Sequence, residues 1–321
     1  MIDGMLTVRK EPGFTSSDVV AKLRGILHQK KIGHTGTLDP AAEGVLPVCL
    51  GSATKLADMI GDRDKEYVAV LRLGVTTDTQ DMTGTVTGTC DPKTVLALSE
   101  EEIRRTAAGF VGEISQIPPM YSAISQNGTR LYELARAGKV VERKPRKITI
   151  YELEIQKIDL PLVTMRVVCS KGTYIRTLCE DLGNALKVGG AMEHLLRTRV
   201  GRFTLEEALT LGQLQEMKDH KPEEILAHVT PIDAFFADAP KVTVSEAAFP
   251  YLNNGNPLSF SNILQEKSDD PRKIMKQAGD PIRVYDHQGN FYGIYTFSGE
   301  RDRMVCVRMF HRVAGDHRPL P

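Results

Sequence analysis

The stretch Lys31-Ile-Gly-His-Thr-Gly-Thr-Leu-Asp-Pro40 decides how the fold of this chain is interpreted. Gly33 and Gly36 permit a tight backbone, and Pro40 biases Asp39 away from helix toward an extended conformation. The pattern predicts a loop that presents the Asp39 carboxylate, and catalytic groups concentrate on loops held by a rigid scaffold. An Asp-Pro pair is also common turn chemistry, so this stretch alone leaves a purely structural role open.

Regular elements are predicted on both sides of this loop. Alternating or continuous apolar residues predict strands at residues 5–9, 45–50, 65–73, 148–158 and 162–169. Helices are predicted after the candidate N-caps Thr15, Ser16 and Ser17, after Ser99 with Glu102, at 131–137 and at about 174–186. Thr204 with Glu207 predicts a further capping box, which opens an acidic helical segment that continues to about residue 227.

The length of 321 residues suggests two domains, on a prior of roughly 150 residues each. After Pro231 the sequence changes to short strand patterns separated by Gly, Asp and Asn turns, which predicts a small β-rich module. We place the boundary near Pro240, with one domain at 1–239 and the other at 240–321. No stretch has the roughly 18 apolar residues of a membrane span and no signal peptide is evident, so we expect a cytoplasmic protein. The five cysteines are scattered, which predicts reduced thiols and no metal.

The overall charge is balanced, but basic and acidic residues are concentrated in different segments of the chain. The 41 basic and 41 acidic residues cancel, and the total therefore favours no particular partner. Between 121 and 150, however, seven basic residues accompany only Glu133 and Glu142, and residues 19–38 carry four basic residues and no acidic one. One such run is usually a solvated face. Two runs flanking one candidate site favour a polyanionic partner.

Common nucleotide-binding signatures are absent from the sequence. Gly51-Ser-Ala-Thr-Lys55 is too short for a phosphate-binding loop, and no dinucleotide fingerprint follows a predicted strand. Nucleotide hydrolysis and hydride transfer therefore lack their usual support.

The motifs resemble those of the TruB family of pseudouridine synthases. The resemblance rests on Gly33-His-Thr-Gly-Thr-Leu-Asp-Pro-Ala-Ala-Glu-Gly-Val-Leu46 and continues through 50–55, 64–67, 72–81, 116–123 and 169–176 in the family's order. It covers about the first 200 residues. One departure is Glu11, because the family usually has Lys-Pro-x-Gly where this chain has Lys10-Glu-Pro-Gly13. This difference concerns a supporting loop and not the motif around Asp39.

The resemblance implies an α+β fold and an RNA substrate. The expected fold is a mixed, largely antiparallel sheet flanked by helices, with a C-terminal PUA-like RNA-binding domain. The expected reaction is isomerisation of uridine to pseudouridine at position 55 in the T-arm of tRNA, with no cofactor consumed. The basic segment at about 121–147 corresponds to an RNA-gripping insertion, and we expect a monomer with tRNA as its partner.

The resemblance also implies roles for individual residues. Asp39 matches the catalytic carboxylate, which attacks C1′, stabilises an oxocarbenium ion or removes a proton. Arg176 matches the partner that holds this carboxylate, and Tyr67 matches the aromatic residue that stacks on the base, whose hydroxyl we expect to help remove the C5 proton. Base flipping leaves a gap in the RNA that His34 is expected to fill. The remaining expected substrate contacts are Asp81, Arg143, Lys144, Tyr174 and Leu195.

Two other functions stay open on the sequence. Archaeal and eukaryotic relatives act on ribosomal RNA with a guide RNA, although the insertion at 121–146 resembles the stand-alone branch. A non-catalytic RNA chaperone is the other alternative, against which the presence of Asp39, Tyr67 and Arg176 argues.

Overall fold

A single large sheet forms the centre of the protein. The computed structural model describes residues 1–321 except 61–63, 127, 271–278, 301 and 312–321. Within the described part, eight strands follow the order β14-β1-β3-β12-β4-β11-β10-β7, while β13 pairs with β12 and β2 pairs with β3. Their bounds are β1 (Gly4–Lys10), β2 (Ile32–His34), β3 (Glu43–Leu50), β4 (Lys65–Leu73), β7 (Gly112–Gln116), β10 (Arg146–Asp159), β11 (Leu162–Cys169), β12 (Gly190–Val200), β13 (Phe203–Thr204) and β14 (Val229–Thr230). In this sheet the β3–β12 pair is parallel and the other strand pairs described are antiparallel, which confirms the mixed, largely antiparallel sheet.

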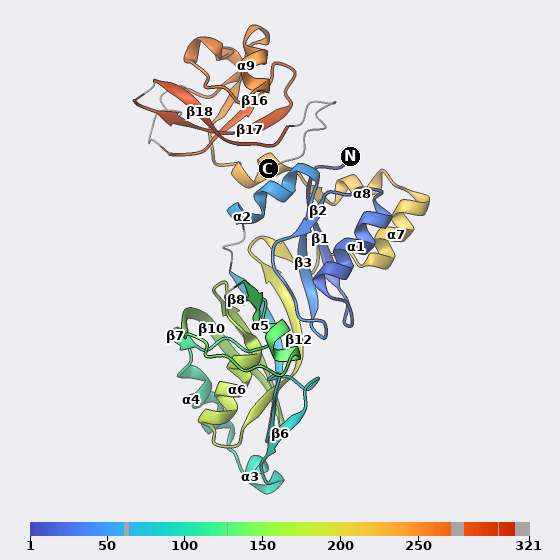
Figure 1. The fold of residues 1–321 in the computed structure, drawn as a ribbon, viewed down its shortest axis with the longest axis vertical. Helices are drawn as coiled ribbons and strands as arrows, with labels where there is room; N and C mark the ends of the chain where they lie inside the picture. The colour runs from blue at the N-terminus through green and yellow to red at the C-terminus, as the bar shows by residue number, and fades with distance from the viewer. Residues whose placement is uncertain (61–63, 127, 271–278, 301, 312–321) are drawn as a thin grey trace.

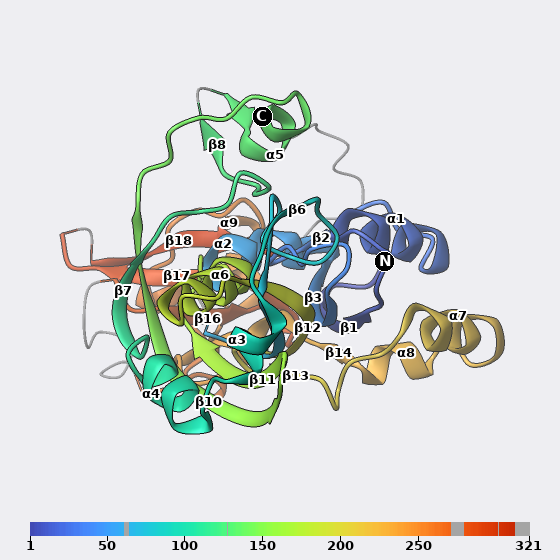
Figure 2. The same cartoon turned by 90° about the horizontal axis from the view of Figure 1, so that it is seen from below.

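Two helices cover the β1–β3 end of the sheet. Helix α1 (Ser16–Ile26) begins at the N-cap Thr15, whose side chain accepts from the amide of Asp18 while Asp18 bonds back to the cap. Helix α7 (Leu211–His220) lies beside α1, and both pack apolar side chains on β1 and β3 (Figures 1 and 2). This end of the sheet carries the loop that contains Asp39.

The other end of the sheet is covered by α6 (Ile175–Ala185) and α4 (Glu100–Ala108), which share an apolar core with β4, β10 and β11. Helix α6 approaches β12 closely at Gly183, where a Cβ atom would lie 2.3 Å from the backbone of Gly189 and Gly190. Only glycine permits this contact, and the close packing fixes the helix that carries Arg176. Among the described residues, no helix is both long and apolar enough to span a bilayer.

Smaller elements extend from this framework. The hairpin of β5 (Val75–Thr77) and β6 (Val86–Thr89) precedes α3 (Pro92–Leu96), and the segment at 121–147 contains β8 (Ser125–Gln126), β9 (Thr129–Arg130) and α5 (Leu131–Arg136). Figure 2 shows β8 and α5 projecting away from the sheet. In the part of the chain that the structure describes, the remaining short helices are α2 (Ala57–Ile60), α8 (Glu224–Ala227), α9 (Phe249–Asn253), η1 (Gly51–Leu56), η2 (Ile232–Phe236), η3 (Glu246–Ala248), η4 (Phe260–Asn262) and η5 (Gln265–Lys267).

A second sheet forms the C-terminal module. Its order is β15 (Lys241–Thr243), β16 (Ile282–Tyr285), β17 (Phe291–Ser298) and β18 (Arg303–Met309). The module is docked on the large sheet: Lys55 Nζ donates to the carbonyl of Met309 at 2.7 Å, and Tyr285 donates to Asp233 at 2.7 Å. A shared apolar cluster that includes Met5, Val45, Phe203, Ile294 and Phe310 fills the contact. Part of the expected module, at 271–278 and 312–321, lies outside the described residues.

Two sequence expectations about elements are wrong or incomplete. Thr204 does not open a helix, because it pairs with Arg199 as part of β13, and α7 instead begins after Thr210 with Gln213 in the capping box. The acidic segment is also interrupted, with α7 ending at His220 and α8 beginning at Glu224. Strand β12 was not predicted, since its mixture of Glu, His, Arg and apolar residues lacks a clean alternation, yet it lies at the centre of the sheet.

Candidate active site

Asp39 lies on the loop between β2 and β3, as the sequence predicts. Hydrogen bonds from other elements fix the backbone of this loop. The amide of Leu38 donates to the buried Ser16 hydroxyl at 2.9 Å, where α1 begins. The carbonyl of Pro40 accepts from Lys10 Nζ at 3.0 Å and from the amide of Gly13 at 2.9 Å. Both residues that flank Asp39 are therefore anchored, which fixes the direction of its side chain.

A buried arginine anchors the other parts of the same loop. Arg197, on β12, is 1% exposed and donates Nε to the carbonyl of Val45 at 2.7 Å. Its two terminal nitrogens donate to the carbonyls of Gly36 at 3.2 Å and Thr37 at 3.4 Å. The Arg197 guanidinium thus bonds three backbone carbonyls, two in the loop and one on β3.

Glycine at position 44 allows Arg197 to lie there. Gly44 pairs with Arg197 where β3 and β12 run parallel, and its φ of +112° is in the range that favours glycine. A Cβ atom on Gly44 would lie 2.2 Å from the carbonyl oxygen of Arg197. The loop that contains Asp39 therefore enters β3 through a contact that any side chain at this position would block.

Arg176 brings its guanidinium against the Asp39 carboxylate through two contacts. Arg176 Nε lies 2.8 Å from Asp39 Oδ2, and Nη2 donates to Oδ1 at 3.1 Å. The remaining donors reach the carbonyls of Thr79, at 3.0 Å, and Tyr121, at 2.8 Å. The Arg176 side chain is 5% exposed and that of Asp39 is 34% exposed, so the pair presents a carboxylate edge to solvent while the arginine stays covered.

Opposing effects set the ionisation of Asp39. Burial raises the pKa of the Asp39 carboxyl, and the adjacent Arg176 guanidinium opposes this rise. The neighbouring Asp81 raises the pKa further and Lys10 lowers it. Lys10 is itself fully buried, and burial lowers its pKa to about 8, against the attraction of Asp39. Burial is the largest effect on the Asp39 pKa, and the contact with Arg176 is the largest effect that favours the carboxylate.

Asp81, an expected substrate contact, bonds to neighbouring residues and lies close to Arg176. Its side chain is buried, and Oδ1 accepts from the Thr79 hydroxyl at 2.8 Å and from the amide and hydroxyl of Thr83 at 3.0 and 2.5 Å. Its Oδ2 lies 3.7 Å from Arg176 Nη1. Asp81 is thus held by hydrogen bonds within the protein. Its carboxylate is the second one, after Asp39, that lies close to the Arg176 guanidinium.

Tyr67 and Leu195 point to the same face of adjacent strands. Tyr67 on β4 is the cross-strand partner of Arg197, and Leu195 on β12 is the partner of Ala69, two residues away on each strand. Tyr67, Leu195 and the loop residue Leu38 belong to one apolar cluster. Burial raises the pKa of the Tyr67 hydroxyl to about 12, with the Arg197 charge opposing the rise. Tyr67 therefore carries a neutral phenol at neutral pH.

Tyr174 and His34 flank this region from two other elements. Tyr174 is the N-cap of α6, and the Gln116 side-chain amide clamps its backbone by accepting from Tyr174 N at 2.8 Å and donating to Tyr174 O at 3.0 Å. His34 ends β2, and its buried Nδ1 has no hydrogen-bond partner among the residues that the structure describes. Burial and the Arg197 charge lower the pKa of His34, which favours the neutral ring.

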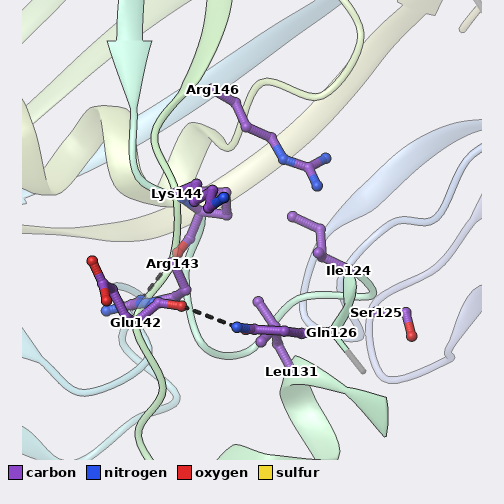
Figure 3. Close-up of a pocket in the computed structure, with 9 residues that line it drawn as sticks. Ile124, Ser125, Gln126, Leu131, Glu142, Arg143, Lys144 and Arg146 are labelled. Atoms are coloured by element: carbon purple, nitrogen blue, oxygen red, sulfur yellow. Dashed lines mark hydrogen bonds between the residues drawn. The ribbon is translucent and has the colours of Figure 1, made fainter. Parts of the chain in front are cut away.

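The basic segment at 121–147 forms a separate pocket of about 410 Å³. Figure 3 shows Arg146 and Ile124 on one side of it and Gln126, Leu131 and Glu142 on another. Arg143 donates to the carbonyl of Pro118 at 3.0 Å, whereas Lys144 is exposed. Asp39 does not line this pocket, but the segment reaches the Asp39 site at its start through the Tyr121 carbonyl on Arg176.

Several residues that organise the site were not identified from the sequence. Lys10, Ser16, Gln116 and Arg197 act through the backbone, and a single basic or polar residue in a strand pattern gives no indication that it is buried. Within the described residues, no group of three His, Cys, Asp or Glu side chains is arranged to hold a metal ion.

Comparison with known proteins finds similarity along nearly the whole chain. Residues 24–175 match the model of the TruB family pseudouridylate synthase N-terminal domain, and 176–237 match that of the tRNA pseudouridylate synthase B C-terminal domain. The tRNA pseudouridine synthase B of Lachnoclostridium phytofermentans is 49% identical over 319 residues, which cover 96% of this chain and 100% of the relative. That of Clostridium kluyveri is 44% identical over 293 residues, covering 91% and 95%.

Solved structures show the same arrangement. The structure of an H/ACA RNP bound to a substrate RNA containing 2′-deoxyuridine has a TM-score of 0.66 at 25% identity, and that of a Cbf5-Nop10-Gar1 complex has a TM-score of 0.66 at 27% identity. Each comparison covers 96% of this chain and 85% of the other.

Proposed function

The chain belongs to the TruB family of pseudouridylate synthases, and from this premise we propose that it isomerises uridine to pseudouridine at position 55 in the T-arm of tRNA. The N1–C1′ bond of the uridine breaks, a C5–C1′ bond forms, C5 loses a proton and N1 gains one, so the reaction consumes no cofactor. The observation that carries the proposal is the Asp39 carboxylate, held by Arg176 at 2.8 and 3.1 Å with one edge exposed.

Asp39 acts on the ribose in this proposal. An ionised carboxylate beside C1′ serves by attack, by stabilising an oxocarbenium ion or by removing a proton, and all three need the same fixed charge. The two-point contact with Arg176 supplies orientation and favours ionisation. Asp81 assists through its ion pair with Arg176 Nη1, which helps to position the guanidinium.

The uracil lies against the face formed by Tyr67 and Leu195, with Tyr174 beside it. Tyr67 stacks on the base, and its phenolate form accepts the C5 proton; burial disfavours this form and the Arg197 charge opposes that effect. Extruding the base costs a few kcal/mol. The His34 ring, neutral and free of a bond at Nδ1, inserts into the space that the base leaves.

Two further regions hold the RNA. The insertion at about 121–147 contacts phosphates through its excess of positive charge, with Lys144 exposed and Arg143 partly engaged by the protein. The C-terminal module at 240–321 is a PUA-like domain that binds the same tRNA and carries no catalytic group. The protein works as a cytoplasmic monomer.

The decisive experiment is to treat an unmodified tRNA transcript with the purified protein and to map pseudouridine by mass-resolved sequencing. We expect modification at position 55 without added RNA or protein. Asp39→Asn, which is nearly isosteric, should abolish it while tRNA binding changes by only a few fold, and Asp91→Asn, at an exposed helix cap far along the chain, should leave it intact. Modification that required a guide RNA, or tRNA refolding without any modification, would replace this proposal with one of the two alternatives.

A further inference from the structure

The turn at residues 77–84, which contacts Arg176, contains a residue in a backbone conformation that residues other than glycine rarely adopt. Gln80 has a φ of +65°, in the left-handed region that favours glycine. Its backbone is nonetheless paired, because Met192 N donates to Gln80 O at 2.9 Å and Gln80 N donates to Thr77 O at 3.3 Å. A residue held in such a conformation needs support from its surroundings.

The support comes from the Gln80 side chain, which uses both ends of its amide on helix α6. Thr177 donates its hydroxyl to Gln80 Oε1 at 2.7 Å, and Gln80 Nε2 donates to Glu180 Oε2. Thr177 and Glu180 are three residues apart and lie on one face of the helix, directly after Arg176. The amide therefore fixes the position of the turn relative to the first turns of α6.

The residues on either side of Gln80 are those that hold Arg176. The carbonyl of Thr79 accepts from Arg176 Nη1 at 3.0 Å, and Asp81 Oδ2 lies 3.7 Å from the same nitrogen. A displacement of Gln80 would move both groups away from the guanidinium.

We propose that Gln80 is a positioning residue, which locks the turn 77–84 to α6 through Thr177 and Glu180 and thereby holds Arg176 in its two-point contact with Asp39. The proposal deepens the function proposed above and rests on it for the activity measurements. An amide suits this position because it accepts from the Thr177 hydroxyl and donates to the Glu180 carboxylate at the same time.

The charges around Glu180 fit this role for a neutral amide. Burial raises the pKa of Glu180, while the bond from Gln80 and the charge of Arg143 oppose the rise. Asp181 is adjacent, and burial followed by the Glu180 charge raises its pKa to about 6. A carboxylate at position 80 would add a third negative group to this pair.

The test first replaces Gln80 and then exchanges the amide and the carboxylate between positions 80 and 180. Gln80→Glu removes the donor to Glu180 and adds repulsion, so we expect the single-turnover rate at saturating enzyme to fall by roughly 10- to 100-fold, a usual effect of misplacing a reacting group. The double variant Gln80→Glu with Glu180→Gln restores a donor and an acceptor with unchanged net charge, and should recover most of the rate. The Kd for tRNA should change by less than a few fold in both.

Thr177→Val provides a variant without any change of charge. It removes only the bond to Gln80 Oε1, and we expect a smaller loss of rate in the same direction. Two controls match the chemistry elsewhere: Gln215→Glu disturbs an exposed amide–carboxylate contact with Asp219, and Thr243→Val removes a buried hydroxyl bond in the C-terminal module. Both should keep the wild-type rate of the chemical step.

A measurement on the enzyme without RNA tests the role of Gln80 independently of the proposed isomerase activity. Carboxyl ¹³C NMR of the free enzyme, with Asp39→Asn to assign the signal, reports the pKa of Asp39, which burial raises and the Arg176 charge lowers. Thr177→Val should raise this pKa, because Arg176 moves away, and the acid limb of the rate profile should move to higher pH. An unchanged pKa in Thr177→Val, a wild-type rate in Gln80→Glu, or a loss that the double variant fails to recover would overturn the proposal. An inactive wild-type enzyme would instead refute the proposed function, leaving the pKa measurement valid.

Discussion

Tyr67 and Arg197 face each other across β4 and β12, so one buried guanidinium lies next to the proposed base-stacking ring and also bonds the loop that carries Asp39. Arg197 therefore contacts both the strand face proposed to hold the uracil and the backbone of the loop that contains Asp39. The two sides of the reacting nucleotide are thereby kept in a fixed relationship, which a reaction that detaches and rejoins a base requires.

Arg176→Lys should lower the rate and shift its pH dependence. Lysine keeps the charge but lacks the planar fork that contacts both Asp39 oxygens and the carbonyls of Thr79 and Tyr121. Arg176 lowers the pKa of Asp39, so weakening the contact raises that pKa, and activity that needs the carboxylate is then lost at a higher pH as the solution is acidified. Single-turnover rates across pH should show the largest deficit at low pH. Arg104→Lys, on α4, is the matched control, and an equal deficit at every pH would contradict the role of Arg176 in ionising Asp39.

Tyr67→Phe and Tyr67→Leu distinguish stacking from proton transfer. We expect Tyr67→Phe to lose about 10²-fold or more in single-turnover rate, a typical contribution of a general acid–base group, because it keeps the ring and removes the hydroxyl beside Arg197. Tyr67→Leu should also lose stacking, worth something like 1–3 kcal/mol. Binding is measured separately on the same transcript. A nearly active Phe variant would reduce Tyr67 to a stacking residue.

Lys10→Met should change how stability depends on pH. Burial lowers the pKa of Lys10 from 10.5 to about 8, so between these values the unfolded chain binds more protons than the folded one, and the folded state gains stability as pH rises. Unfolding of the wild type in denaturant should gain up to about 3 kcal/mol over this interval relative to Lys10→Met. The difference between the two proteins removes the contribution of other groups. Parallel curves for wild type and variant would show that Lys10 titrates normally.

Gly44→Ala should lower the stability of the protein more than Gly112→Ala, although both glycines have a similar positive φ. Gly44 and Gly112 have φ angles of +112° and +108°. A Cβ atom at 44 would meet the Arg197 carbonyl at 2.2 Å, whereas one at 112 would meet no described atom within 4 Å. We expect Gly44→Ala to lower the free energy of unfolding by about 1–3 kcal/mol more than Gly112→Ala, the usual cost of overpacking. Equal losses would mean that strain alone matters at both positions.

Lys144→Glu should weaken tRNA binding by a salt-dependent amount. Lys144 is exposed within the basic insertion, and losing one phosphate contact lowers the slope of log affinity against log salt by about 0.7–0.9. Arg143→Glu should weaken binding further by also breaking the bond to Pro118. Lys93→Glu, exposed at the distant helix α3, serves as the control of equal charge change. A slope for Lys144→Glu equal to that of the control would leave the insertion without a phosphate contact at this residue.

The sequence indicated the architecture and the two residues of the central ion pair, but not what holds them. Asp39 and Arg176 lie in motifs whose spacing and resemblance could be recognised, and the strand containing Tyr67 has a clear alternation. Strand β12 does not, because its polar face carries charged residues and Arg197 occupies a core position. Thr204 has the local pattern of a capping box, and pairing with β12 overrode it. Lys10 and Arg197 resemble surface residues in the sequence because their partners are backbone carbonyls, which no residue pattern identifies.

The parallel contact of β3 with β12 has a consequence for the order of folding. It joins the catalytic loop to residues that follow it by about 150 positions, since Arg197 and Val45 are 152 apart in the chain. Long-range pairings form slowly, because a long loop must close before the contact is gained. During synthesis, a chain that has not yet emerged as far as β12 contains Asp39 and Tyr67 but not the guanidinium that shapes their surroundings. The arrangement around Asp39 is thus completed only after β12 has joined the large sheet.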